Sequence, residues 1–467
     1  MSAMTTGERH AVFSLATIFS LRMVGLFMIL PVFSVYGASL NGATPLLIGV
    51  AVGSYGLAQL MLQIPFGLWA DRFDRKKLIL IGLLLFVIGG AVAAQATNIW
   101  WVIIGRFLQG AGAISAVVMA LLSDLVRDEH RTRAMAVVGM SIGISFAIAF
   151  VLGPWVADIF GLSGLFWVTS VMGIAAMLLC VWRVPRARQA QRQLPPHYMI
   201  HLREMLAVPE LRRLNIGIFT LHLVMTACFV SLPPLLVAAG LPVSQHGWLY
   251  LPVMLIAFVA LIPAVIIAEK KHRMREVYLS AVVLLFVAMI ALAFAHKGLV
   301  ALIISVALFF FAFNLLEALL PSLVSKISPA GGKGTAMGIY STSQFLGAFL
   351  GGVTGGALHQ WQHGSGIFLV LAVATVFWLW RAYSMAQPAY LHSVILQPEG
   401  EGRGQVGDVN SGAGQSLSEQ ALSEIRALAG VEELVVLPDD ALIYLKVDKL
   451  RWQPESLTPW PVRIIAT

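Results

Sequence analysis

The feature that most constrains the fold is a series of apolar runs, each near the length that a helix needs to cross a membrane. About 20 apolar residues, rising roughly 1.5 Å each, span the hydrocarbon core of a bilayer. The chain is 58% hydrophobic and only 12% charged, whereas a typical soluble protein has about 25% charged residues, so we interpret it as an integral membrane protein. We assign twelve spans: Ala11–Tyr36, Thr44–Ala70, Leu78–Ala96, Ile99–Ser123, Ala134–Phe160, Gly164–Val184, Arg213–Ala238, Gln245–Ala268, Val277–Ala295, Leu299–Ser325, Thr335–His359 and Gly366–Ala386.

The positions of the charged residues predict the orientation of the spans. Lys and Arg gather in the connections that follow the even-numbered spans, as in Arg72–Lys77 and Lys270–Arg275, and Lys297 is the exception on the other side. By the positive-inside rule, both termini face the cytoplasm. Most Lys and Arg lie beside apolar runs, so the net charge of +8 indicates no nucleic-acid partner. The first run is too long for the apolar core of a signal peptide and contains Arg22, so we expect it to stay as a helix.

The longest connection between spans, Pro185–Leu211, divides them into two sets of six. We expect an N-terminal six-helix half over residues 1–184, a cytoplasmic linker over 185–211 and a C-terminal six-helix half over 212–386. Two halves of this kind commonly enclose a substrate site near the midplane of the bilayer. The predicted fold class is an all-α membrane protein with twelve transmembrane helices, followed by a small α+β domain over residues 387–467.

The last part of the chain has a mixed pattern in place of the apolar runs. We expect, in order, a strand at Tyr390–Leu396, a flexible loop at Glu399–Gln415, a helix capped by Ser416 and ending near Ala429, and a hairpin of Glu432–Leu437 with Ala441–Val447. This order is typical of a ferredoxin-like domain. After Leu450 the sequence predicts no element. The domain has no C-x-x-C pair, and Cys180 and Cys228 lie inside apolar runs, so we expect no cofactor, no metal site and no disulfide.

Ionisable and polar residues inside the spans are costly in hydrocarbon, and each is therefore a functional candidate. Arg22 lies eleven residues into the first span, which is about 16 Å along a helix and near the middle of the membrane. Its alternative role is a structural pairing with a neighbouring helix. Tyr55, Gln59 and Gln63 share one face of the second span at i, i+4 spacing. They could line a polar route, or they could bond helices together.

Three further candidates lie in the C-terminal half. Asn314 and Glu317 share a face of the tenth span at i, i+3 spacing, and Glu317 lies about 13 Å along the helix from Lys326. Burial disfavours a charged carboxyl group and a nearby Arg favours it, so a change of conformation can switch protonation; we choose Glu317 first as the proton-binding group. His222 in the seventh span is the second choice, because imidazole titrates near neutral pH. Its alternative is a simple hydrogen-bonded histidine.

A dense charged turn separates the second and third spans and has the spacing G-x-x-x-D-R-x-x-R-K. Gly67 would let a helix pack closely against its neighbour, and Asp71 is placed to cap the positive N-terminus of another helix. The cations Arg72, Arg75 and Lys76 are also explained by topology alone. Because topology does not explain the preceding Gly and Asp, we interpret the turn as a conformational latch.

This turn resembles the signature between the second and third helices of the major facilitator superfamily, G-x-L-a-D-r-x-G-r-K. Trp69 and Asp74 depart from that signature, and because Asp tolerates positive φ better than most residues, we expect the turn to keep its form. The stretch that begins at Arg106 and includes Gly110 resembles the family motif R-x-x-q-G-x-g.

A third motif lies in the fifth span. Gly153 and Pro154 match the antiporter-type motif g-x-x-x-G-P-x-x-G-G of this family, while Ala149, Ala157 and Asp158 depart from it. Pro154 should kink the helix, and the small residues around Gly153 should give a tightly packed face.

The resemblance implies a proton-driven exporter of small organic compounds, multi-pass in a bacterial inner membrane, that works by alternating access. It implies a role in proton coupling for Arg106, a contact of Asp71 with the N-terminus of the eleventh helix, and a pairing of Arg75 with Asp124 at the end of the fourth. Both contacts would lock the state open to the outside.

The expected partners are protons, a small organic substrate and the lipid bilayer, for a monomer that is not an enzyme. The sequence has no Walker loop, which disfavours ATP-driven pumping. Two alternatives stay open. One is uptake of a metabolite or sugar on the same fold, because a fold does not determine a function. The other is a transporter-like membrane sensor that signals through the C-terminal domain.

Overall fold

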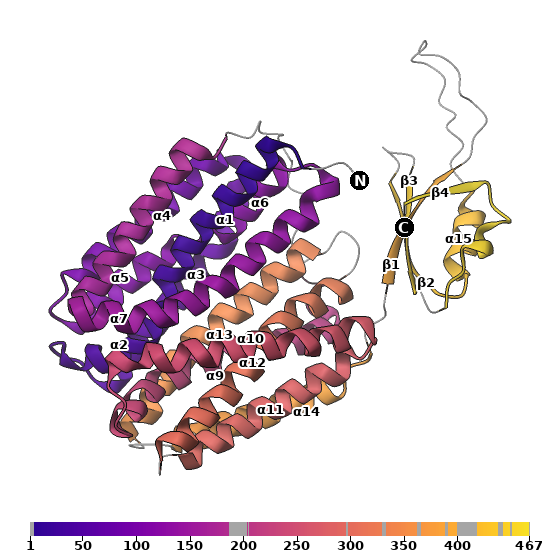
Figure 1. Ribbon diagram of the computed structural model, residues 1–467. Coiled ribbons are helices and arrows are strands. Elements are labelled where there is room, and N and C mark those ends of the chain that lie inside the picture. Colours follow the sequence, from indigo (N-terminus) through magenta and orange to yellow (C-terminus); the bar gives the residue numbers. More distant parts are fainter. Residues whose placement is uncertain are drawn as a thin grey trace.

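The computed structural model describes residues 4–185, 203, 205–295, 298–328, 333–361, 366–387, 391–398, 418–437, 442–448 and 451–466. Within them the chain forms a bundle of long helices and a small α+β domain (Figure 1). The helices of the bundle are α1 (Thr6–Phe27), α2 (Leu30–Tyr36), η1 (Gly37–Ser39), α3 (Pro45–Arg72), α4 (Arg75–Ala94), α5 (Ile99–Ala111), α6 (Ser115–Leu125), α7 (Asp128–Arg183), α9 (Pro209–Ala238), α10 (Val243–Lys270), α11 (Met274–Phe294), α12 (Leu299–Ile327), α13 (Lys333–Trp361) and α14 (Gly366–Tyr383).

The described helices account for the expected number of membrane crossings. Ten helical stretches are long and apolar enough to span a bilayer. The stretch Arg133–Arg183 is 51 residues long and contains two crossings, because Gly161 interrupts the helical geometry of α7 with φ 66°. The glycine-rich α13, at 29 residues, adds one more. The twelve-helix fold that the sequence predicts is thereby confirmed.

Two predicted spans are interrupted within their length. The first continues only as far as Phe27, and α2 starts anew at Leu30 with Pro31 in its first turn. Proline lacks the N–H that would continue the helix and its ring clashes with the preceding turn, which explains the break. The fourth span separates into α5 and α6 around Gly112, where an added Cβ would overlap the carbonyl oxygen of Gly82 in α4. Close contact of two helix backbones therefore determines this second break.

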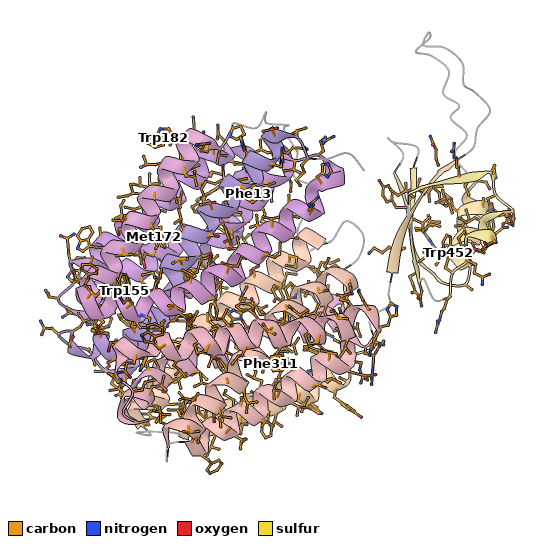
Figure 2. All side chains as sticks on the ribbon, viewed as in Figure 1. Phe13, Trp155, Met172, Trp182, Phe311 and Trp452 are labelled. Atoms are coloured by element: carbon orange, nitrogen blue, oxygen red, sulfur yellow. The ribbon has the colours of Figure 1, made fainter. Side chains whose placement is uncertain are left out.

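The outer surface of the bundle is apolar, as a lipid-facing surface must be. Phe13, Trp155 and Trp182 are 63%, 58% and 75% exposed and project from the helices in Figure 2. Large side chains of this kind on a water-soluble protein would form an aggregation-prone patch, whereas in a bilayer they are solvated by lipid.

The two ends of the bundle differ in how the halves meet. We call the end with the turns Phe73–Asp74 and Val126–Arg127 the charged end, and the end with η1 the neutral end. Towards the neutral end, the N-terminal helices share one apolar core with the C-terminal half, including Phe150 of α7 and Phe310 of α12. Near the charged end, the N-terminal helices form a core of their own. The two sets of helices accordingly diverge towards the side where the N-terminus lies in Figure 1.

Glycines bring α13 into backbone contact with both halves. An added Cβ on Gly49 of α3 would overlap the carbonyl oxygen of Gly352, and one on Gly53 would lie 2.7 Å from the Phe349 oxygen. On the other face of α13, an added Cβ on Gly347 would overlap the Phe219 oxygen of α9. Small residues allow helices to approach this closely in membranes. Contact between α3 and α13 therefore closes the neutral end.

Near the charged end, α13 has open space beside it. A Cβ built on Gly334 or Gly338 would meet no atom within 4 Å among the residues that the structure describes. The described conformation is thus closed at the neutral end and separated at the charged end.

The C-terminal domain has the predicted ferredoxin-like order and one strand more than predicted. Its elements are β1 (Leu391–Pro398), α15 (Glu419–Ala427), β2 (Val431–Leu437), β3 (Leu442–Asp448), η4 (Pro454–Leu457) and β4 (Val462–Ala466). The sheet order is β2-β3-β1-β4 with antiparallel neighbours. The strand β4, in the region without a predicted element, pairs with β1, and η4 stands before it. Ser418 caps α15 in place of Ser416, while the predicted loop Glu399–Gln415 lies outside the described residues.

A hydrogen bond between described residues joins this domain to the bundle. Lys446 Nζ of β3 donates to the carbonyl oxygen of Ser328, 3.0 Å away, at the C-terminal end of α12. A cation at this position complements the negative end of the helix dipole.

We expect Leu445→Ala to unfold the C-terminal domain selectively. Leu445 is fully buried in the small core beneath α15. Loss of its buried methyl groups should cost about 2–5 kcal/mol, which is a large part of the stability of a domain this small. Limited proteolysis of the full-length protein should then remove the domain quickly and leave the bundle intact. Val436→Ala in β2 is the control, because Val436 is 39% exposed; equal protease sensitivity of the two variants would contradict the prediction.

Candidate functional site

The first polar group inside the bundle surrounds Tyr55 of α3. We call Arg22, Tyr55, Gln59 and Arg106 the Arg–Tyr cluster. All four side chains are buried, with exposed fractions of 4% or less. Their helices meet because Gly110 has no side chain: an added Cβ there would overlap the Tyr55 carbonyl oxygen. The glycine of the predicted R-x-x-q-G motif thus permits α5 to lie against α3.

Hydrogen bonds link Arg22 and Gln59 to the phenol of Tyr55. Arg22 Nη2 donates to Tyr55 Oη over 2.7 Å, and Nη1 donates to Ser115 Oγ over 3.3 Å. Gln59 Nε2 donates to the Gly110 carbonyl oxygen over 2.7 Å and to Tyr55 Oη over 3.4 Å. Gln59 therefore both joins α3 to α5 and contributes to the polar interior. Gln63, one turn further along α3, is buried, and its Oε1 has no described partner.

Arg106 also lies near the Tyr55 ring. Its guanidinium carbon is 5.1 Å from the Tyr55 ring centre, and that of Arg22 is 5.9 Å away. Arg106 Nη1 donates to Gln109 Oε1 over 3.0 Å, and Gln109 Nε2 donates to Thr169 Oγ1 over 3.1 Å. Gln109 belongs to the R-x-x-q-G motif, but the sequence alone does not mark it as a site residue. In the structure, Gln109 holds the Arg106 side chain in place.

The second polar group lies in the C-terminal half. We call His222, Glu317 and Gln344 the carboxyl cluster, which joins α9, α12 and α13. Gln344 Nε2 lies 2.8 Å from His222 Nε2 and 3.3 Å from Glu317 Oε1. Glu317 Oε2 is buried without a hydrogen-bond donor in the described structure and lies 3.9 Å from His222 Nε2. Sequence reasoning missed Gln344, because nothing in the pattern of α13 separates it from the other polar residues of that helix.

Asn314 does not take part in this cluster. It is buried one turn before Glu317, and its Nδ2 lies 3.9 Å from Met254 Sδ of α10. Asn314 and Glu317 lie one turn apart on α12, as the spacing predicts, but they contact different helices: Asn314 contacts α10 and Glu317 contacts α13.

Aromatic rings connect the two halves between these polar groups. The ring centres of Phe27 and Phe146 are 4.9 Å apart, and those of Phe146 and Phe313 are 5.8 Å apart. Phe313 in turn lies 6.0 Å from the ring of His222. Phe27 follows Arg22 on α1, and Phe313 precedes Glu317 on α12 by one turn. In the described conformation Phe146 and Phe313 pack against each other in the apolar core that the two halves share.

The predicted latch turn is partly present. Arg75 forms an ion pair with Asp124 and also donates to the carbonyl oxygens of Ala70 and Ala120 over 3.0 and 2.9 Å. This pairing coexists with a closed neutral end, so it does not by itself lock the state open at that end. Lys76 Nζ donates to the Val181 and Val184 carbonyl oxygens at the end of α7, 3.0 and 2.6 Å away.

Four further residues of the turn are Gly67, Asp71, Arg72 and Asp74. An added Cβ on Gly67 would meet only Ala116, at 4.0 Å, so the close helix approach is absent from this conformation. Asp74 has φ −56° and caps α4 through Lys77 N, so it needs no tolerance of positive φ. Arg72 is exposed. The Asp71 side chain lies outside the described part of the chain, and its contact with α13 stays a prediction.

The fifth-span motif lies at the break between α1 and α2. An added Cβ on Gly153 would overlap the Met28 carbonyl oxygen, so α7 contacts the backbone where α1 ends. Pro154 lies within α7, and the non-helical residue of α7 is Gly161. Gly153 therefore provides the tightly packed face that the motif predicts.

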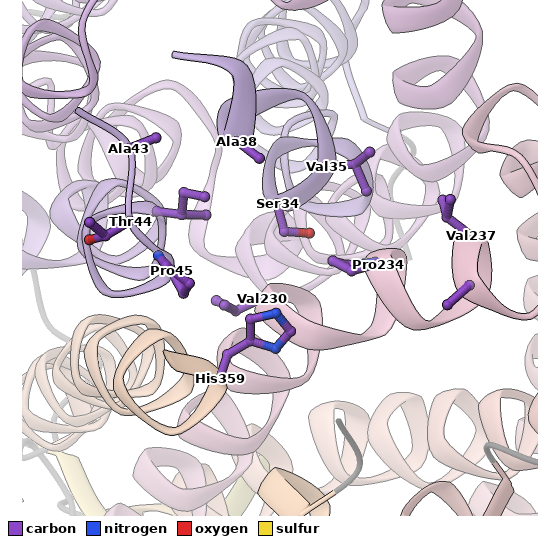
Figure 3. A pocket seen from close by; sticks show the side chains of 12 residues that line it. Ser34, Val35, Ala38, Ala43, Thr44, Pro45, Val230, Pro234, Val237 and His359 are labelled. Atoms are coloured by element: carbon purple, nitrogen blue, oxygen red, sulfur yellow. The ribbon is translucent and has the colours of Figure 1, made fainter. Parts of the chain in front are cut away.

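A pocket of about 420 Å³ lies between the halves at the neutral end (Figure 3). Its N-terminal wall includes Ser34, Thr44 and Pro45, and its C-terminal wall includes Val230 and His359. The volume is in the range of small-molecule sites. Among the described residues, no group of three or more His, Cys, Asp or Glu could hold a metal ion.

We expect the Arg75–Asp124 pair to be measurable as a coupling energy. In thermal unfolding, Arg75→Gln should destabilise more than Asp124→Asn, because Arg75 also bonds two carbonyl oxygens. The double variant should fall short of additivity by about 1 kcal/mol. The exposed pair of Arg273 and Glu276, three residues apart at the start of α11, is the control and should couple more weakly. Strict additivity at Arg75 and Asp124 would contradict the prediction.

Comparison with known proteins agrees with the fold and the motifs. Residues 15–352 and 214–429 match the Major Facilitator Superfamily. The chain is 45% identical over 446 residues to the inner membrane transport protein YajR of Escherichia coli (strain K12), with 95% of each chain covered. It is 24% identical over 346 residues to the multidrug resistance protein MdtH of Aeromonas salmonicida (strain A449), covering 74% of this chain and 86% of the relative.

Solved structures show the same architecture. A D-xylose-proton symporter superposes with a TM-score of 0.67 at 15% identity, covering 81% of this chain and 98% of that one. At such identity the likeness concerns the fold. Together with the family match, the twelve-helix bundle and the small C-terminal sheet, it confirms the resemblance that the charged turn indicated. The chain belongs to the Major Facilitator Superfamily and is a multi-pass membrane transport protein.

Proposed function

We propose that the protein exports small organic compounds from the cytoplasm in exchange for protons, by alternating access of its two halves. The observation that carries the proposal is the environment of Glu317. Its carboxyl group lies within the membrane, bonds Gln344 of α13 and leaves Oε2 without a donor. The side chain as a whole is 37% exposed while its Oε2 is buried. A carboxyl group at membrane depth is a natural proton carrier, because surroundings of low polarity disfavour its charged form.

The coupling step follows from the position of α13. This helix carries Gln344, contacts α9 within its own half and contacts α3 across the interface. Protonation of Glu317 removes a charge next to α13 and changes the strength of its bond to Gln344. Protonation thereby changes the stability of the contact between α13 and α3, and that contact holds the neutral end closed. His222 shares the same Gln344 and is placed to act with Glu317.

We place the charged end and both termini in the cytoplasm of a bacterial inner membrane, in line with the positive-inside rule. Residues 1–184 and 212–386 then act as the moving halves, 185–211 as the linker and 387–467 as a cytoplasmic regulator. The relative named multidrug resistance protein MdtH supports export of organic compounds. We propose a monomer, because each chain contains both halves.

Transport into proteoliposomes tests the proposal. Purified protein is reconstituted with a pH-sensitive dye inside, an acid-inside gradient is imposed and a panel of lipophilic compounds is added. For a proton exchanger, at least one compound should dissipate the gradient in protein-containing vesicles and leave protein-free vesicles unchanged. If the compounds cross without moving protons, the coupling is wrong; if folded protein moves none of them, export is wrong and uptake should be measured next.

A further inference from the structure

The Arg–Tyr cluster has more unpartnered hydrogen-bond donors than acceptors; among its described atoms, the buried acceptor without a partner is Gln59 Oε1. The Nε atoms of Arg22 and Arg106 are both buried, and neither has an acceptor in the described structure. Tyr55 Oη accepts from Arg22 and from Gln59, so the hydrogen of its own hydroxyl group also has no described acceptor. Three buried donors around one ring thus lack partners, and buried donors without acceptors are costly.

The same cluster also has an unbalanced charge. Across the described residues, neither guanidinium forms an ion pair with a carboxylate; their partners are the neutral side chains of Ser115, Tyr55 and Gln109. By contrast, Arg75 and Arg127 near the charged end pair with Asp124 and Glu8. A buried charge is normally paired, because an uncompensated one is strongly destabilising in a medium of low dielectric constant. An anion bound beside the two guanidinium groups would compensate their positive charges at membrane depth.

We infer that the Arg–Tyr cluster binds the anionic group of the substrate, and that the exported compounds are amphipathic organic anions of the carboxylate type. A carboxylate accepts up to about four hydrogen bonds and matches the planar guanidinium fork, so it can satisfy the donors that the chain leaves open. Phe27, which follows Arg22 on α1 and is only partly buried, provides an apolar contact for the rest of the molecule. This inference rests on the proposed transport function and names its substrate class.

Binding to the purified full-length protein tests the inference without transport. The probes are 4-phenylbutyrate and 4-phenylbutylammonium, which share one apolar body and differ in charge. Binding of each radiolabelled probe is measured by scintillation proximity, and its effect on thermal unfolding is recorded in parallel. The carboxylate should bind at least about tenfold more tightly than the ammonium and should raise the unfolding temperature. Tighter binding of the ammonium would overturn the inference.

Three variants connect binding to the cluster. Arg22→Gln and Arg106→Gln should each weaken carboxylate binding about tenfold, and Tyr55→Phe, which removes only the hydroxyl donor, about threefold. Arg9→Gln is the matched control, because Arg9 lies exposed on the same helix as Arg22. Tyr55→Phe keeps the aromatic ring, so it still tests the cluster if either arginine variant fails to fold. Unchanged carboxylate binding in every folded variant would overturn the inference.

Two further outcomes separate the possible sources of failure. If sodium chloride at the probe concentration stabilises the protein as much as 4-phenylbutyrate, the cluster holds an inorganic anion, and the substrate class is wrong. If the carboxylate binds through the arginines but no proton movement accompanies its transport, the anion site stands and the proposed proton exchange falls. If protons move with a cationic compound and the carboxylate does not bind, the proposed proton exchange stands and the anion site falls.

Discussion

Replacing Glu317 by Gln is expected to abolish proton-coupled transport while leaving the protein folded. Glutamine has nearly the same shape and can still bond Gln344, but it cannot take up or release a proton. The loss should be on the order of 10²-fold in the rate of compound-dependent proton movement, the lower end of what a positioned proton-transferring group contributes in catalysis. Because Glu317 lies on α12 beside α13, no other described acid has the same contacts.

The measurement compares two activities in one vesicle preparation: compound-dependent proton movement and exchange of substrate across the membrane. Proton movement should vanish in Glu317→Gln, whereas exchange of labelled for unlabelled substrate across the membrane, which needs no net proton transfer, should persist. Glu276→Gln on α11 is the control, since Glu276 is half exposed and pairs with Arg273 on its own helix. Proton movement within twofold of the unmodified protein would show that another group carries the proton.

Gly352→Ala is expected to shift the protein away from the conformation closed at the neutral end. An added Cβ at Gly352 would overlap the Gly49 carbonyl oxygen of α3, a backbone atom that cannot rotate away. Overpacking of this kind costs roughly 1–3 kcal/mol. Since about 1.4 kcal/mol is a tenfold change in an equilibrium, the ratio of the closed to the open conformation should fall roughly 5- to 150-fold. The transport rate should fall with it, because alternating access needs both conformations.

Spin labels at Asn41 and Val237, one in each half at the neutral end, report this shift as a longer distance. Gly347→Ala is the matched control on the same helix. Its added Cβ would overlap the Phe219 carbonyl oxygen within the C-terminal half, so it should lower thermal stability and leave the label distance unchanged. An unaltered distance in folded Gly352→Ala would mean that α3 and α13 do not hold the neutral end closed.

Local chemistry explains why much of the fold was predictable. The length of each apolar run sets where a helix crosses the membrane, and the Pro-rich, Arg-rich connection separates two equal sets of helices. The breaks at Pro31 and Gly112 were not predicted, and only the break at Pro31 has a cause that the local sequence shows. Proline interrupts any helix locally, but Gly112 ends α5 only because Gly82 of another helix lies against it.

The candidate site was only partly predictable for the same reason. A polar residue inside an apolar run stands out, and on that basis the sequence predicts Arg22 and Glu317 as site residues, whereas Arg106 rests on the family motif. Their partners do not stand out: Gln344 lies 122 positions along the chain from His222, and no local pattern relates them. The position of β4 in the sheet likewise depends on β1, which precedes it by a long stretch of chain.

By itself, the sequence determined the twelve crossings, the two halves, the ferredoxin-like order of the C-terminal domain and the family, because these depend on hydrophobicity, spacing and short motifs. The tertiary structure alone decided which side chains meet and which end of the bundle is closed. Contacts between distant helices are set by packing, and two conformations of a transporter share one sequence. The unpaired donors around Tyr55 and the free oxygen of Glu317 are properties of that packing.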